Sequence, residues 1–157
     1  MIDANFASFL ILILTSVLLF YVAANDLREL KIRNELLIVL VVLFVAHAAV
    51  SGRWVQLHWN IAFAAAGFIF MLYWYGQGYM GGGDLKLLTV ALLWTGIGCV
   101  LPFLIIMAGA ALLHTLLGRL GLIQVQYAHN RMKVAFAPSI AAGLIGIFML
   151  GCLHPMH

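Results

Sequence analysis

The chain has 157 residues, of which 66% are apolar and only 8% are charged, and its mean hydropathy is +1.12. A soluble domain is closer to half apolar and a quarter charged. So few charged residues cannot cover the surface of a soluble fold, and the composition also excludes disordered, collagen-like and disulfide-scaffold chains. The sequence therefore predicts an all-α integral membrane protein. At about 20 residues for each membrane helix, the length allows roughly five or six spans in a single transmembrane domain, 1–157.

The net charge of +3 comes from eight Lys and Arg against five Asp and Glu. In a membrane chain such a surplus indicates topology rather than nucleic-acid binding, so no nucleic-acid partner is predicted. Cys99 and Cys152 form no CxxC pair, and no metal site is predicted. No basic residue precedes the first apolar run, which we therefore interpret as a permanent span and not as a cleaved signal peptide.

Six apolar runs follow one another along the chain. We predict membrane spans at about 6–25, 36–50, 59–75, 79–96, 98–118 and 134–153. As a single helix, residues 85–118 would be about 50 Å long, against a hydrocarbon core of about 30 Å. Two helices that turn near residues 96–98 fit the membrane better. The fourth span then begins near residue 79.

The basic residues predict which side of the membrane each loop faces. Loops 26–35, 76–86 and 119–133 lie on one side of a six-span chain. Together they carry seven of the eight basic residues, namely Arg28, Lys31, Arg33, Lys86, Arg119, Arg131 and Lys133. The opposite side carries only Arg53. By the positive-inside rule the side with seven charges is cytoplasmic, so both termini are expected outside the cytoplasm.

Asp26 and Asp84 are the two acidic residues that neither a terminus nor a solvated basic loop explains. Asp26 closes the first predicted span and Asp84 opens the fourth, so both are expected at the cytoplasmic face and at similar depth. An acid at the edge of the hydrocarbon is costly and usually faces protein, water or a partner. Two such acids brought together would share a proton and could act as a general acid and base on a peptide bond. The alternative is structural: Asp84 caps a helix and Asp26 pairs with Arg28.

Three glycines directly precede the second of these acids, in the order Gly81, Gly82, Gly83, Asp84. Three consecutive residues without side chains let a second backbone approach closely. A protease at a membrane must receive an extended peptide beside its acid, and a glycine-rich turn makes that room. The competing structure is a reentrant or unwound stretch at the glycines, which is allowed only where protein or water surrounds it.

These residues resemble the type IV prepilin peptidases, a family of membrane aspartyl proteases. Residues 81–86, with the sequence GGGDLK, are similar to that family's GxGD-x-K motif. Residues 26–34 are similar to its first motif, an Asp followed by a basic stretch and Ile-Pro-Asn, although Arg33 stands where the family usually has Pro. Phe136-Ala137-Pro138 is similar to the family less specifically. The resemblance covers about 20–155.

The resemblance implies a six-span aspartyl endopeptidase of the cytoplasmic (inner) membrane. Such an enzyme removes the short leader from prepilin or pseudopilin precursors at the cytoplasmic face, and it needs no cofactor. The resemblance implies Asp26 and Asp84 as the catalytic pair. It implies supporting roles in substrate binding or motif geometry for Gly81, Gly82, Gly83, Lys86 and Asn34. The partners implied are precursor peptides and the lipid bilayer, and the oligomeric state is open.

Many bacterial members of that family also carry a methyltransferase region with paired CxxC motifs. This sequence lacks those motifs, so it resembles the small peptidase-only branch that serves tight-adherence (Flp-type) pili or archaeal-type filaments. We therefore expect cleavage without N-methylation by this chain.

Other functional classes stay open at this stage. A presenilin-like intramembrane protease also uses GxGD, but its first Asp lies in a later span. A proton-coupled carrier could use Asp26 and Asp84 as a relay, although carriers tend to bury acids near the midplane within repeats. A non-enzymatic scaffold of a pilus machine is a further possibility. The position of both acids at one membrane edge, without a visible repeat, favours the protease.

Two further expectations concern the span ends. Cys99 and Cys152 both fall at outer ends of spans, so a disulfide is geometrically possible, although neither buried cysteine needs a partner. The tryptophans lie near span ends and fit an aromatic belt at the membrane surface; they are Trp54, Trp59, Trp74 and Trp94.

Overall fold

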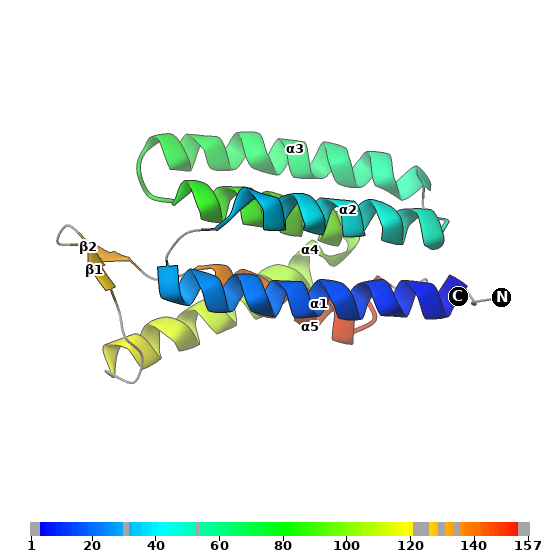
Figure 1. Ribbon diagram of the computed structural model, residues 1–157. Coiled ribbons are helices and arrows are strands. Elements are labelled where there is room, and N and C mark those ends of the chain that lie inside the picture. Colours follow the sequence, from blue (N-terminus) through cyan, green and yellow to red (C-terminus); the bar gives the residue numbers. More distant parts are fainter. Residues whose placement is uncertain are drawn as a thin grey trace.

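The computed structural model describes residues 4–29, 32–52, 54–120, 126–128, 131–133 and 136–153. In chain order its elements are α1 (Ala4–Glu29), α2 (Asn34–Val50), α3 (Trp54–Gly76), α4 (Gly82–Arg119), β1 (Gln126–Ala128), β2 (Arg131–Lys133) and α5 (Ala137–Met149). Figure 1 shows a helical bundle with a small β-hairpin projecting from one end. Lys31 and Arg53, two of the basic residues used to predict the topology, lie outside the described residues.

The helices have the length and surface of a membrane protein. Within the described residues, α1, α3 and α4 are each long and apolar enough to cross a membrane. The apolar helices α2 and α5 are shorter, at 17 and 13 residues. Large apolar side chains cover the outside of the bundle, and Phe20, Ile69 and Ile105 are each about 70% exposed. Such a surface suits lipid, so the composition and the fold agree on a membrane protein. Six membrane crossings and the side on which the termini lie remain predictions.

Helix α4 is broken at Gly96, where a turn was predicted. Gly96 has φ 54° and ψ −167°, a backbone conformation that is essentially restricted to glycine. The break gives two helical segments, 82–95 and 97–119, and the chain reverses direction between them (Figure 1). The last carbonyl groups before a helix break lack the backbone N–H donors that the next turn would have supplied. Here Asn60 Nδ2 donates a hydrogen bond to the Leu93 carbonyl at 3.1 Å.

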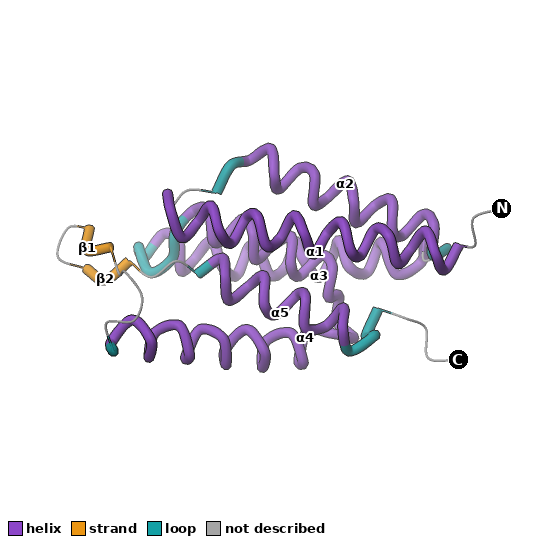
Figure 2. The backbone as a smooth tube through the Cα atoms, turned by 60° about the horizontal axis from the view of Figure 1, so that its bottom comes forward, coloured by secondary structure: helices purple, strands orange, loops and turns teal. Residues whose placement is uncertain are grey.

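The reversal at Gly96 places the ends of the helices in a regular alternation. Figure 1 shows, at one end of the bundle, the ends of α1 and α3, the starts of α2 and α5, and both ends of α4, and Figure 2 shows the same bundle turned by 60°. The start of α1, the α2–α3 connection and the end of α5 lie at the opposite end. This is the alternation of connections that the predicted topology requires. We call the end that holds the end of α1 and the starts of α2 and α4 the motif end, because both sequence motifs, 26–34 and 81–86, lie there.

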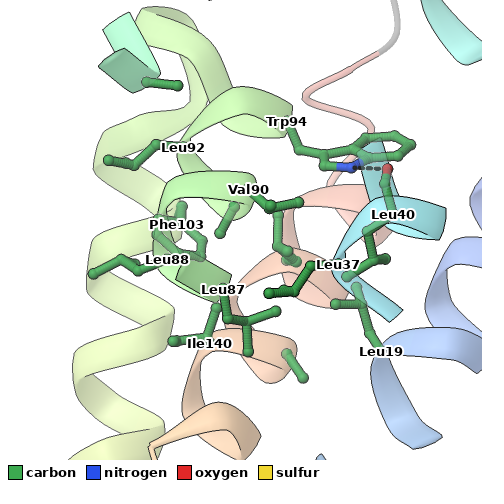
Figure 3. Packing of buried hydrophobic residues seen from close by; sticks show 14 of the residues in the cluster. Leu19, Leu37, Leu40, Leu87, Leu88, Val90, Leu92, Trp94, Phe103 and Ile140 are labelled. Carbon is green, nitrogen blue, oxygen red and sulfur yellow. Dashed lines mark hydrogen bonds between the residues drawn. The ribbon is translucent and has the colours of Figure 1, made fainter. Parts of the chain in front are cut away.

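The core lies where α4 packs against α2, α3 and α5, and where α1 packs against α2 and α5. Figure 3 shows Leu19, Leu37 and Leu40 facing side chains of α4 and α5. Trp94 is only 1% exposed, and its Nε1 donates a hydrogen bond to the Leu40 carbonyl at 3.2 Å. The prediction that Trp94 belongs to an aromatic belt is therefore wrong, because this residue packs in the core against Phe44 and Phe148. Trp54, Trp59 and Trp74 are exposed, as a belt requires.

Three details differ from the sequence-based expectations. Strands β1 and β2 form an antiparallel hairpin within predicted loop 119–133, so the chain is not purely helical. Gly82 and Gly83 are helical, which contradicts the unwound alternative for the glycine run. Cys99 and Cys152 form a disulfide with a Cα–Cα distance of 6.1 Å, a pairing that the sequence left open. The disulfide ties the start of the second segment of α4 to the turn after α5, at the end opposite the motif end.

Candidate active site

Asp26 lies in the last turn of α1, and its side chain faces the bundle. The residue is only 4% exposed. Its Oδ2 accepts a hydrogen bond from the backbone N–H of Ala137 at 3.3 Å. Ala137 is the first residue of α5, and the free N–H groups at a helix start favour negative charge. The amino end of α5 therefore holds this carboxylate.

Asp84 lies in the first turn of α4 and is partly buried. The residue that caps this helix is Gly81, with extended φ −73° and ψ 144°, and it makes no side-chain capping hydrogen bond. The carboxylate of Asp84 lies over Gly81: a Cβ built on that glycine would be 3.0 Å from Asp84 Oδ2. The lack of a side chain at Gly81 thus makes the space that the carboxylate occupies.

Asp26 and Asp84 both lie at the motif end, in the last turn of α1 and the first turn of α4, and the charge of Asp26 acts on the Asp84 carboxyl group. Their helices, α1 and α4, make no direct backbone contact within the described residues, but both pack against α2 and α5. The fold therefore brings Asp26 and Asp84 together indirectly, across the starts of α2 and α5. The structural alternatives do not account for them: the cap of α4 is Gly81, and no ion pair between Asp26 and Arg28 occurs in the described part of the chain.

Each of the other two glycines has its own close neighbour. A Cβ on Gly82 would meet the Tyr75 ring at 3.4 Å, and a Cβ on Gly83 would meet the Ile32 side chain at 3.4 Å. Ile32 belongs to the segment that leads into α2. The glycine run therefore lets the start of α4 approach both the end of α3 and the entry to α2, as expected from close backbone packing.

A hydrogen bond joins the two sequence motifs directly. Lys86 Nζ donates to Asn34 Oδ1 at 3.0 Å, from the start of α4 to the start of α2. Both side chains are exposed. Arg33, which replaces the usual proline of the first motif, forms an ion pair with Glu35 at 2.8 Å. Lys86 and Asn34 thus act on the same local arrangement, the seating of α4 against α2.

One group at this site was not identified from the sequence, the amide of Ala137. A backbone donor carries no residue-type signal, and only the proline that follows at position 138 marks a helix start there. Among the described residues no group of three or more His, Cys, Asp or Glu side chains could hold a metal ion. The chemistry that the site offers is that of two neighbouring carboxylates, one buried and one partly open.

Comparison with known proteins identifies the family. Residues 13–118 match the model of the type IV leader peptidase family, and this match includes Asp26, Asn34 and residues 81–86. The chain belongs to this family of membrane peptidases, as the sequence motifs indicated. Searches of curated proteins and of solved structures each gave no significant match.

Proposed function

We propose that this protein is an aspartyl endopeptidase that removes the leader from type IV prepilin or pseudopilin precursors. The observation that carries the proposal is the position of Asp26 and Asp84 at the motif end, on two helices that have no backbone contact with each other among the described residues. Membership of a leader peptidase family supports a peptidase that processes precursors. That membership also disfavours the carrier and the non-enzymatic scaffold.

In the proposed reaction a water molecule lies between the two carboxyl groups. One carboxylate removes a proton from the water as its oxygen attacks the scissile carbonyl carbon, and the other carboxyl group protonates the carbonyl oxygen. Collapse of the tetrahedral intermediate breaks the C–N bond, and the leaving nitrogen takes up a proton. The products are a leader with a new carboxylate and a mature chain with a new amino group.

In this proposal the motif end faces the cytoplasm, with the protein in the inner membrane. The surplus of basic residues in the three predicted loops at this end supports that orientation. The disulfide between Cys99 and Cys152 adds independent support, because disulfides persist in oxidising compartments and this one lies at the opposite end. A leader attached to a cytoplasmic precursor would then reach the pair directly.

The proposal is tested with the purified full chain in lipid and a synthetic precursor peptide that contains a leader and its cut site. Mass spectrometry should detect the free leader and the mature peptide, without any added cofactor. If no prepilin-type peptide is cut while the same vesicles show proton flux that requires both Asp residues, the protein is a carrier and the proposal is wrong.

A further inference from the structure

The β-hairpin projects from the motif end of the bundle, the end that also holds the candidate active site (Figure 1). Strands β1 and β2 form a two-stranded sheet, and within the described residues neither strand contacts a helix. An unpaired strand edge presents a row of amide and carbonyl groups that can pair with another extended chain. We propose that β2 binds the precursor segment next to its cut site as an added β-strand. This inference rests on the proposed function.

The register shows which backbone groups are available. Ala128 pairs with Arg131, Tyr127 with Met132, and Gln126 with Lys133. Only two residues separate Ala128 from Arg131, and the pair that closes such a hairpin is a hydrogen-bonded pair. Hydrogen-bonded and non-hydrogen-bonded pairs alternate along antiparallel strands. The amide and carbonyl of Met132 therefore point away from β1, and those of Tyr127 point away from β2.

Of the two strands, β2 is the one that directly precedes α5 in the sequence. Four peptide steps separate Lys133 from Ala137, a distance of at most about 14 Å for an extended chain. The N–H of Ala137 is itself 3.3 Å from the Asp26 carboxylate. A substrate strand paired with Met132 would cover the remaining distance to Asp26 with at most about six extended residues. The hairpin is thus within reach to hold the substrate backbone in the extended form that a protease requires.

Strand addition of this kind recognises the substrate mainly through its main chain. The precursor would therefore be sensitive to changes in its amide groups at every second position, because alternate amides of an added strand face the edge. Side-chain changes at the same positions would matter less. This periodicity distinguishes strand addition from helical or irregular binding.

The test uses a set of precursor peptides, each with one N-methylated peptide bond, moved one residue at a time across both flanks of the cut. We expect kcat/KM to fall about 10-fold at every second position on one flank and little at the positions between, as for loss of one or two hydrogen bonds. A uniform response, or none, would overturn strand addition. Failure to cut the unmodified peptide would instead refute the proposed function.

Two matched proline variants identify the edge. Met132→Pro removes an outward-facing amide, which an edge strand tolerates without losing a bond to its partner. Tyr127→Pro makes the same change on the opposite edge. We expect Met132→Pro to raise KM about 10-fold with little change in kcat. It should also abolish the alternating response of kcat/KM to N-methylation along the peptide. Tyr127→Pro should leave KM and the alternating response unchanged. Equal effects of the two variants on KM, with wild-type thermal stability, would contradict binding at β2. An effect on KM that grows with protein concentration would also contradict it, because it would indicate strand pairing between two copies of the chain.

Discussion

Lys86 Nζ and Asn34 Oδ1 lie 3.0 Å apart in a hydrogen bond that joins two sequence motifs 52 residues apart. The bond links the start of α4, which carries Asp84, to the start of α2. Beside it, Gly83 packs against Ile32 from the same entry segment. Together these contacts seat the acid of the second motif against the first motif.

A double-mutant cycle tests this link. Lys86→Met and Asn34→Ala should each lower the rate of leader cleavage a few-fold. The double variant should cleave as fast as the slower of the two single variants. Because both side chains are exposed, the coupling free energy should be only about 0.5–1 kcal/mol. Fully additive effects on the cleavage rate would show that the two residues act independently.

Gly81→Ala tests whether the missing side chain makes room for the catalytic carboxylate. The new Cβ would lie 3.0 Å from Asp84 Oδ2, so the carboxylate must move. We expect the cleavage rate to fall about 10-fold or more, because small misplacements of a reacting group are costly, with little loss of thermal stability. Gly76→Ala is the matched control, since its Cβ would meet nothing within 4 Å. Equal rates for the two variants would contradict this account.

The helical fold and the position of the site were accessible from the sequence for separate physical reasons. The length of residues 85–118 relative to a bilayer required a turn, and the structure breaks the helix at Gly96. Alternating connections then placed Asp26 and Asp84 at one end of the molecule. The predicted turn and the predicted position of the two Asp residues both depend on hydropathy and segment length, which can be read directly from the sequence.

What the sequence did not reveal depends on long-range packing. The amide of Ala137 meets Asp26 across 111 residues, and a backbone donor leaves no mark in the residue type. Trp94 is buried through its packing against Phe44 and Phe148 and its hydrogen bond to the Leu40 carbonyl, all of them partners distant in sequence. The short strands β1 and β2 carry too few residues for a clear alternating pattern.

Gly96→Ala should destabilise the fold. Its φ of 54° disfavours any side chain, and a Cβ would collide with the Asn60 carboxamide. We expect a loss of about 1–3 kcal/mol, measured as a lower Tm in detergent or lipid. Gly98→Ala is the control, because it lies in helix with open space around it, and it should be neutral or slightly stabilising. A wild-type Tm for Gly96→Ala would show that the break is not needed.

The disulfide predicts both stability and orientation. Replacing Cys99 and Cys152 by Ser should lower the free energy of unfolding by about 2–4 kcal/mol. In spheroplasts, a membrane-impermeant reductant followed by an impermeant maleimide should label both cysteines of the wild-type chain, because this end is expected outside the cytoplasm. The double Ser variant gives the background signal. Labelling that occurs only after the membrane is permeabilised would reverse the proposed orientation.

The central claim is that Asp26 and Asp84 together cleave the leader. The most direct measurement is the rate of leader release from a precursor by wild type, Asp26→Asn, Asp84→Asn and Glu29→Gln, each checked for an intact disulfide and an unchanged Tm. Glu29 is an exposed acid three residues after Asp26 on α1, so its variant makes the same loss of charge away from the pair. We predict that each Asn variant loses about 10³-fold or more of the rate, as expected for a general acid or base, and that Glu29→Gln keeps it. Full-rate cleavage by either folded Asn variant would contradict the two-carboxylate account.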